Sequence, residues 1–332
     1  MAVAAIELKM RAVVAAKPGP VATLKLVEVD KPEAGDSDIV VRVHSSSANP
    51  VDLFPTTPAG YLMGGRKPQV LGTDFAGVVE ATGKSVTRFQ PGDEVFGGGK
   101  GTFAEFVRLA ETAAVVRKPP SVPFDQAGAV TVAGSTALQA LRDHGRLKAG
   151  QSVLINGASG GVGTFAVQIA KALGAEVTAV CRTRNVEMVR SLGADKVIDY
   201  TGEDFTRGGA RYDLILDIAA SHSLNECRRV LQPAGTFVGV GAAAVQHTSA
   251  GTIRAFGHFL GTKVVSLAGR QRVVSLFIAK LSGSDLEFLG DLLESGRIKS
   301  MIERSYDLDQ VPEALAYLNE GHARGKLAIR VA

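Results

Sequence analysis

The sequence has few of the residues that characterise secreted, membrane or disulfide-stabilised proteins. It contains only two cysteines, Cys181 and Cys227, and no tryptophan. Two cysteines exclude a disulfide scaffold and suit a reducing cytoplasm, and both are expected to be small buried side chains. No window approaches the ~20 uninterrupted apolar residues of a membrane-spanning helix. The N-terminal segment becomes charged too soon, at Glu7 and Lys9, for a secretory signal peptide, so a cytoplasmic location is expected.

Runs of like charge are also missing. The formal net charge is +4, and the 37 basic residues are spread along the chain rather than gathered in one segment. This distribution argues against a nucleic-acid partner or a membrane-binding surface. The chain has 332 residues, of which 45% are hydrophobic and 38 are glycine. That composition fits a soluble α/β protein of two domains with many tight turns.

The most informative segment present is the glycine-rich stretch 155–165, Ile-Asn-Gly-Ala-Ser-Gly-Gly-Val-Gly-Thr-Phe. It follows an apolar run, 152–155, and precedes a helix-like run, 165–173, so it indicates a strand, a glycine turn and a helix. This is the context of a dinucleotide-phosphate loop, in which the N–H groups and the dipole of the helix N-terminus attract phosphate. Glycine turns also join strands and helices for structural reasons alone, but here the flanks favour a nucleotide site.

Each glycine of this loop has an expected role. Gly157 permits the tight turn, Gly160 lets the backbone approach a pyrophosphate, and Gly163 allows close packing of the helix on the strand. The residues expected to contact the cofactor phosphates are Ser159, Gly160, Gly161, Val162 and Gly163.

The next predicted strand, Glu176–Cys181, ends where an NAD enzyme carries the carboxylate that holds the adenosine ribose. Here the chain has Arg182, Thr183 and Arg184 instead. Arginine offers planar, charge-assisted donors for a 2′-phosphate, which a carboxylate would repel. These residues favour NADPH over NADH as the cofactor, although both arginines would also suit the solvated start of a helix.

The hydrophobic pattern divides the chain into a β-rich part and an α/β part. Up to about residue 130, short β runs are broken by glycine and proline, and no 3.6-residue period persists. From about residue 131, predicted strands alternate with helical segments, the first at Thr136–Asp143, which implies a doubly wound parallel sheet. The strands predicted in the two parts are Arg11–Ala16, Ile39–Ser45, Gly77–Ala81, Phe103–Arg108, Ser152–Ile155, Glu176–Cys181, Lys196–Asp199, Leu214–Ile218 and Thr236–Val240.

The C-terminal part is expected to complete both domains. A sixth strand is predicted at Lys263–Leu267, a helix at Ser284–Ser295 and a final strand at Leu327–Val331. The final strand should return to the first domain, because the glycine loop begins mid-chain and the Rossmann sheet is complete before the end. The predicted fold is therefore α/β. It combines a central Rossmann domain, residues 131–270, with a β-rich domain formed by residues 1–130 and 271–332.

The order of these parts resembles the medium-chain dehydrogenase/reductase superfamily, and the local motifs resemble its zinc-independent, quinone oxidoreductase-like branch. The motifs occur in the family's order between residues 10 and 331, and they are Ala48–Asp52, Gly72–Val79, Pro91–Gly97, Gly134–Ala137, the glycine loop and Gly321–Lys326. The resemblance implies a GroES-like fold for the β-rich domain and hydride transfer from a nicotinamide cofactor.

The residues of this chain argue against a metal. Zinc-bearing relatives carry a His-Glu pair where this chain has Thr73 and Asp74, and a cysteine near the segment Ser45–Asn49. The β-rich domain has no cysteine, which also rules out a four-cysteine structural zinc site. No metal is therefore expected.

Without a metal, hydrogen-bond donors must stabilise the negative charge that develops on a quinone or enone oxygen. The resemblance places Asn49 beside the nicotinamide, where its amide is a candidate catalytic donor; the alternative is a cap of the following turn. Tyr61, in the predicted loop 54–68, is a second candidate donor or a wall for a flat substrate, and otherwise an ordinary loop residue. His44 and Asp52 are weaker candidates.

The resemblance implies further cofactor contacts, each with a structural alternative. Thr136 would bind the nicotinamide carboxamide or a phosphate, or else cap a helix. Tyr200 would line the adenosine phosphate pocket, or else be a half-buried aromatic. Gly239 and Gly241 would let the nicotinamide pass at the carboxyl edge of the sheet, or merely turn the chain. Lys326 would reach the cofactor, or else be a solvated surface charge.

The favoured function is the metal-free, NADPH-dependent reduction of a small-molecule quinone or α,β-unsaturated carbonyl. The alternatives are an NADPH-binding module without turnover and a zinc-free alcohol or ketone dehydrogenase. The segment Ala242–Gly261 is apolar with few charges and would cover the substrate or pair with another subunit. The resemblance implies a homodimer, because members of the family often dimerise through the edge of the Rossmann sheet.

Overall fold

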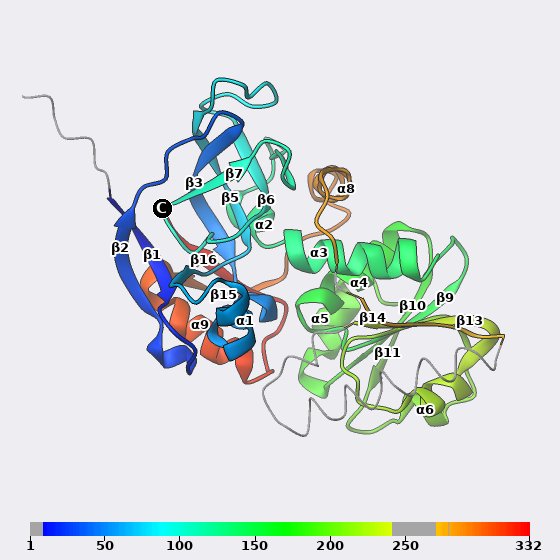
Figure 1. Ribbon diagram of the computed structural model, residues 1–332. Helices are drawn as coiled ribbons and strands as arrows, with labels where there is room; N and C mark the ends of the chain where they lie inside the picture. Colours follow the sequence, from blue (N-terminus) through cyan, green and yellow to red (C-terminus); the bar gives the residue numbers. More distant parts are fainter. Residues whose placement is uncertain (1–8, 241–269, 278) are drawn as a thin grey trace, which may run out of the picture. The chain divides into compact units, whose positions relative to one another are not determined.

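The computed structural model describes residues 9–240, 270–277 and 279–332 and divides into two compact units (Figure 1). The first, called here the β-rich unit, holds the described residues up to Val132 together with Leu281–Glu294 and Ile302–Ala332. The second, called the Rossmann unit, holds the described residues of Ala133–Lys280 together with Ser295–Met301.

The Rossmann unit is built on a six-stranded parallel sheet with the order β11-β10-β9-β12-β13-β14. Its strands are β9 (Ser152–Asn156), β10 (Glu176–Cys181), β11 (Lys196–Asp199), β12 (Tyr212–Asp217), β13 (Leu231–Val240) and β14 (Arg272–Phe277). The central strands β9, β10 and β12 consist mostly of buried apolar residues, as expected where helices cover a parallel sheet. The order of the strands confirms the predicted Rossmann fold, and β10 and β11 have the predicted bounds.

The ends of β9, β12 and β13 differ from their predicted bounds, and two further predictions for this unit differ from the structure. Helix α3 (Thr131–Leu138) begins before the predicted start at Thr136 and continues through a π-helical turn at Gln139–His144. The small residues before Thr136 belong to the helix, although no residue pattern there indicates a helix start. The sixth strand, β14, lies beyond residue 270, where the β-rich domain was predicted to resume. The strand predicted at Lys263–Leu267, like Gly241 and the segment 242–261, lies outside the described residues.

The β-rich unit contains two sheets. One has the order β2-β1-β4, and the other has the order β15-β16-β3-β5-β6-β8, with β7 also paired to β3. The strands are β1 (Lys9–Ala15), β2 (Lys25–Asp30), β3 (Asp38–Ser47), β4 (Gln69–Val70), β5 (Asp74–Thr82), β6 (Glu94–Gly98), β7 (Phe106–Ala110), β8 (Val115–Arg117), β15 (Ile302–Asp307) and β16 (Lys326–Arg330). Because β16 pairs antiparallel with β3, the predicted return of the final strand is confirmed.

Short helices complete both units. The Rossmann unit has α4 (Gly161–Ala172), α5 (Val186–Ser191) and α6 (Leu224–Arg229), and the β-rich unit has the 3₁₀ helix η2 (Pro50–Thr56), α1 (Pro58–Met63), α2 (Phe124–Gly128), α8 (Gly283–Glu294) and α9 (Val311–Asn319). Helix α1 and part of η2 occupy segment 54–68, which was predicted to be a loop. Its glycines and prolines favoured a loop, although the segment forms helical turns. Within the described ranges, no helix has the length and hydropathy needed to cross a membrane.

Both cysteines are buried in the Rossmann unit, as expected. Cys181 ends β10 and is 1% exposed, and Cys227 lies in α6 with no exposed surface. Burial raises the pKa of the Cys181 thiol to about 11 and raises that of Cys227 as well. Both side chains are therefore neutral thiols at physiological pH.

Candidate functional site

The glycine turn of the Rossmann unit joins β9 to α4. Gly157 has a φ of +92°, in the left-handed region that favours glycine. A Cβ on Gly163 would lie 2.7 Å from Ala158 Cα, so only glycine lets α4 pack this closely on the turn. A Cβ on Gly160, by contrast, would meet only Gly157 O, at 3.9 Å. The space beside Gly160 is thus kept free of protein atoms.

The N-terminus of α4 is suited to bind an anion. Its first intrahelical bond runs from Thr164 N–H to Gly160 O at 2.9 Å. The N–H groups of Gly161, Val162 and Gly163 therefore have no acceptor within the helix and stand at the positive end of its dipole. Ser159 is half-buried just before them. The free space beside Gly160, together with these donors, fits a pyrophosphate group.

The carboxyl ends of β9 and β12 meet where the strand order reverses, which is where open α/β sheets bind ligands. Asn156 Nδ2 donates to Asp217 Oδ1 at 2.8 Å and lies 3.0 Å from Ser221 Oγ. Gly239 on β13 pairs in register with Asp217 and so lies at the same edge. The sequence did not lead us to predict a role for Asn156 or Asp217. Each is a polar residue at the end of an apolar strand, β9 and β12, and this pattern could have identified them.

The next strand end carries the residues expected to bind the 2′-phosphate. Arg182, Thr183 and Arg184 follow β10 and are exposed. Tyr200 follows β11, and because Cys181 pairs with Asp199, Tyr200 lies at the same edge as Arg182. Tyr200 is 55% exposed, so it is more exposed than the half-buried aromatic residue that was the alternative to a cofactor contact. The structure therefore gathers the four residues at one edge of the sheet.

Thr136 lies inside α3 and is 8% exposed. Because the helix begins at Thr131, the alternative role of Thr136 as a helix cap is wrong. Its contact with a cofactor stays a prediction.

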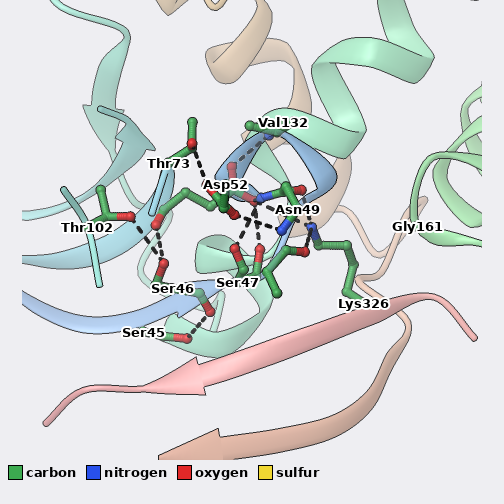
Figure 2. A network of polar contacts seen from close by, with 12 residues as sticks. Ser45, Ser46, Ser47, Asn49, Asp52, Thr73, Thr102, Val132, Gly161 and Lys326 are labelled. Atoms are coloured by element: carbon green, nitrogen blue, oxygen red, sulfur yellow. Dashed lines mark hydrogen bonds and ion pairs between the residues drawn. The ribbon is translucent and has the colours of Figure 1, made fainter. Parts of the chain in front are cut away.

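The β-rich unit contains a buried polar network, which Figure 2 shows from close by. Its members come from the end of β3, from η2, from the start of β5 and from the start of β16, so segments far apart in the sequence meet here. The side chains that carry its main contacts are Ser47, Asn49, Asp52, Thr73, Asp74 and Lys326.

Asp74 is the central acceptor of this network and has no exposed surface. Its Oδ2 accepts from Ser47 Oγ at 2.6 Å and from Asn49 Nδ2 at 2.9 Å. Its Oδ1 accepts the backbone N–H of Val132 at 2.9 Å. The Lys326 ammonium lies 3.6 Å from Oδ2 and compensates the carboxylate charge.

Lys326 is 3% exposed, so its alternative role as a solvated surface charge is wrong. Its Nζ donates to Asn49 Oδ1 at 2.5 Å and to the backbone carbonyl of Ala48 at 3.2 Å. Burial lowers the pKa of Lys326, and the nearby Asp74 and Asp52 carboxylates oppose that shift. Asn49 Nδ2 also donates to Ser47 O at 3.1 Å, so both amide hydrogens of Asn49 have acceptors inside the protein.

Asp52 is a second buried carboxyl, 2% exposed. It accepts from Thr73 Oγ1 at 2.7 Å and from the Asn49 backbone N–H at 2.8 Å. Burial raises the pKa of Asp52 to about 7; the two hydrogen bonds oppose this shift, whereas the neighbouring Asp74 adds to it. Titration near neutral pH is typical of groups that move protons in catalysis.

Tyr61 lies on α1 and is half-buried. It belongs to a stretch, η2 and α1, that carries four of the five large hydrophobic side chains found exposed in the described residues. These four are Val51, Phe54, Leu62 and Met63. The stretch offers an apolar surface with which a flat, weakly polar molecule can pack.

The comparisons with known proteins agree with this architecture. One family model, described as an alcohol dehydrogenase GroES-like domain, matches residues 35–120, and another, described as a zinc-binding dehydrogenase, matches residues 192–329. The mitochondrial NAD(P)H oxidoreductase RTN4IP1 of Mus musculus is 34% identical, and the match covers 89% of this chain and 82% of that protein.

Two further similarities span nearly the whole chain. The trans-enoyl reductase pgmF of Aspergillus terreus is 33% identical, with 90% of this chain and 87% of that protein covered. A solved structure of the quinone oxidoreductase from Coxiella burnetii has a TM-score of 0.85 and 29% identity, with 98% of this chain and 100% of that chain covered.

A zinc ion does not fit the residues of this chain, despite the description of the second family model. Zinc-bearing relatives carry a His-Glu pair where this chain has Thr73 and Asp74, and the segment Ser45–Asn49, near which they carry a cysteine, contains none here. The ammonium of Lys326 already lies beside Asp74 and would repel a second cation there. Across the part of the chain that the structure describes, no group of three or more His, Cys, Asp or Glu side chains could hold a metal ion.

Proposed function

The chain belongs to the zinc-independent, quinone oxidoreductase-like branch of the medium-chain dehydrogenase/reductase superfamily, and we propose that it is an NADPH-dependent reductase of quinones or α,β-unsaturated carbonyls. The observation that supports NADPH is the end of β10, where exposed Arg182 and Arg184 stand in place of a ribose-binding carboxylate. The trans-enoyl reductase and quinone oxidoreductase relatives support the two classes of acceptor.

The apolar stretch formed by η2 and α1 supports a flat, conjugated substrate. Its exposed side chains, among them Phe54 and Leu62, can pack against a ring or an enone, whereas they provide no polar group to recognise a sugar or a phosphate. The hydride is supplied by the bound cofactor, and the chain binds and orients the two reactants. Cofactor contacts by Thr136, Gly239, Tyr200 and Lys326, homodimer formation and a cytoplasmic location stay predictions.

Replacing Arg182 and Arg184 together with alanine is expected to raise the Kd for NADPH about 10- to 100-fold, because two charge-assisted contacts to the 2′-phosphate are lost. The Kd for NADH should change little, since NADH has no phosphate there. Arg190→Ala is the matched control, because Arg190 is an exposed arginine nearby that pairs with Glu187 at 2.5 Å. Quenching of NADPH fluorescence measures all three variants, and equal losses for NADPH and NADH would contradict the assignment.

Turnover distinguishes the proposed reductase from its alternatives. Quinones, enones or enals are expected to oxidise NADPH. Secondary alcohols are not expected to reduce NADP⁺. NADPH binding without oxidation by any conjugated acceptor would identify a binding module instead. Oxidation of secondary alcohols would favour an alcohol dehydrogenase.

A further inference from the structure

In the polar network of Figure 2, the Thr73 hydroxyl donates to the buried carboxyl group of Asp52. Asp52 is 2% exposed, whereas Thr73 is half-buried. Resting on the proposed function, we propose that Thr73 is a catalytic residue that donates a proton to the substrate oxygen during reduction, and that Asp52 resupplies that proton through Thr73. These two side chains are called here the Thr73–Asp52 relay.

The contacts of Asp52 make Thr73 the route by which its proton is exchanged. Its Oδ2 accepts the backbone N–H of Asn49 at 2.8 Å, and a peptide N–H donates a hydrogen bond but relays no proton. Its Oδ1 accepts from Thr73 Oγ1 at 2.7 Å, and a hydroxyl both donates and accepts. A proton that leaves Asp52 therefore passes through the Thr73 hydroxyl.

The protonation state of Asp52 sets the direction in which Thr73 donates. A threonine hydroxyl has one hydrogen and two lone pairs. When Asp52 is ionised, that hydrogen is held by the carboxylate. When Asp52 is protonated, the acid donates to Thr73 Oγ1, and the hydroxyl hydrogen is free to turn outward. The protonated acid is therefore the state that serves a substrate oxygen.

The groups that face Asp52 keep this state accessible near neutral pH. Burial raises the pKa of Asp52 to about 7, and Asp74 at the start of β5 acts in the same direction. The hydrogen bonds from Thr73 and Asn49, and the charge of Lys326 at the start of β16, act against it. Efficient proton donors have a pKa near the working pH, so this balance suits the relay.

Asn49 holds Asp52 in place but is a poor donor to the substrate. Its two amide hydrogens are directed to Asp74 Oδ2 and Ser47 O. Its amide oxygen accepts from Lys326 Nζ at 2.5 Å, which fixes the orientation of the group. Asn49 is therefore a positioning residue, and the outward donor is Thr73.

The relay balances the reduction in atoms and charge. A hydride from NADPH forms a C–H bond at the far end of the conjugated system, and the π electrons move onto the carbonyl oxygen. That oxygen takes the Thr73 hydrogen, while Thr73 Oγ1 takes the proton of Asp52, which becomes a carboxylate. NADP⁺ and a neutral enol or hydroquinone tautomer result. After the product leaves, water returns a proton to Asp52 through Thr73.

Thr73→Val tests the relay, because it removes the hydroxyl and keeps the shape. We expect kcat to fall about 100-fold with an unchanged Kd for NADPH, and Thr73→Ser to restore most of the activity. Thr206→Val is the matched control. Thr206 is a buried threonine of the Rossmann unit whose hydroxyl also donates to a carboxylate, Asp204 Oδ1, at 2.7 Å, and its replacement should leave kcat near the wild-type value.

The pH profile separates a relay from a structural role. The wild-type kcat/KM is expected to fall as pH rises through about 7, because protonated Asp52 is the active form. In Asp52→Asn, the new amide can accept from the Asn49 N–H and donate to Thr73 Oγ1, as the protonated acid does. Since it releases no proton, this variant should have a lower kcat and no decline near pH 7.

A second readout needs no cofactor. The pKa of Asp52 is raised from 3.8 to about 7 in the folded chain. Between these pH values the folded chain keeps a proton that the unfolded chain has lost, so Asp52 makes the free energy of unfolding fall as pH rises. Urea unfolding of the cofactor-free protein should show this slope in the wild type and a smaller slope in Asp52→Asn.

Two results would overturn the relay while leaving the proposed function intact. One is a Thr73→Val protein with wild-type kcat and an unaltered pH profile, in a wild type that reduces quinones or enones. The other is an Asp52→Asn protein whose unfolding shows the same pH dependence as the wild type. A wild-type protein that binds NADPH and reduces neither class of acceptor would overturn the proposed function and the relay together.

Discussion

Gly163→Ala is expected to abolish measurable NADPH binding and to lower the free energy of unfolding by about 1–3 kcal/mol. The added methyl group would lie 2.7 Å from both the Cα and the carbonyl carbon of Ala158. These are backbone atoms of the turn, so they cannot move aside as a flexible side chain would. Helix α4 must shift, and its first-turn N–H groups then leave the positions that fit a pyrophosphate.

Gly160→Ala is the control for this prediction, because it adds the same methyl group in the same turn. That methyl group would meet only Gly157 O, at 3.9 Å, and the φ of −84° at Gly160 suits alanine. Stability should therefore change by less than about 1 kcal/mol, while NADPH binding weakens because the space kept for phosphate is filled. Urea unfolding and NADPH titration distinguish the variants; equal loss of stability in both would contradict this account of the turn.

Lys326→Met is expected to lower the free energy of unfolding by about 3–5 kcal/mol, the largest effect on stability of any single replacement proposed for this chain. The change keeps the length and apolar stem of the side chain but removes its charge. Asp74, which has no exposed surface, is then left as an uncompensated buried carboxylate. Asn49 Oδ1 also loses its donor, so the amide that holds the network together is no longer oriented.

Lys9→Ala shows by contrast what an exposed pair contributes. Lys9 Nζ lies 2.6 Å from Asp30 Oδ1, closer than Lys326 lies to Asp74, but the two side chains are 60% and 86% exposed. Because water already solvates both charges, this replacement should leave the free energy of unfolding nearly unchanged. Chemical denaturation of both variants at one pH is the measurement. Similar losses would mean that the burial of the Lys326 pair contributes little.

The Rossmann unit was predictable from the sequence to a large extent. Strand β10 has the predicted bounds because a parallel strand covered on both faces is a nearly continuous apolar run bounded by polar turns. The short edge strand β11 also has the predicted bounds, with Val197 and Ile198 between the charged Lys196 and Asp199. The β-rich unit was less predictable. Strand β4 is only two residues long, Gln69–Val70, and its pairing with β1 depends on residues distant in the sequence. Such a short segment has no pattern of its own.

The candidate site divides in the same way. The phosphate loop and the Arg182–Arg184 segment are local, so their chemistry is visible in consecutive residues. The Thr73–Asp52 contact joins residues 21 positions apart, and the contact of Lys326 with Asn49 spans 277 positions. The burial of Lys326 follows from the pairing of β16 with β3; the sequence predicted that the final strand returns to this domain, but not which strand it pairs with. A lysine in a polar, glycine-containing segment therefore resembled a surface residue.

Quinones and enones are electrophiles that add to thiolates, so a protein that reduces them risks being alkylated by its own substrates. The chain has only two sulfhydryl groups, Cys181 and Cys227, and both are enclosed by the Rossmann unit. Burial also keeps them in the un-ionised form, which is a weak nucleophile. Prolonged exposure to quinones or enones should therefore leave both cysteines unmodified. The protein should remain active after the added quinone or enone has been consumed.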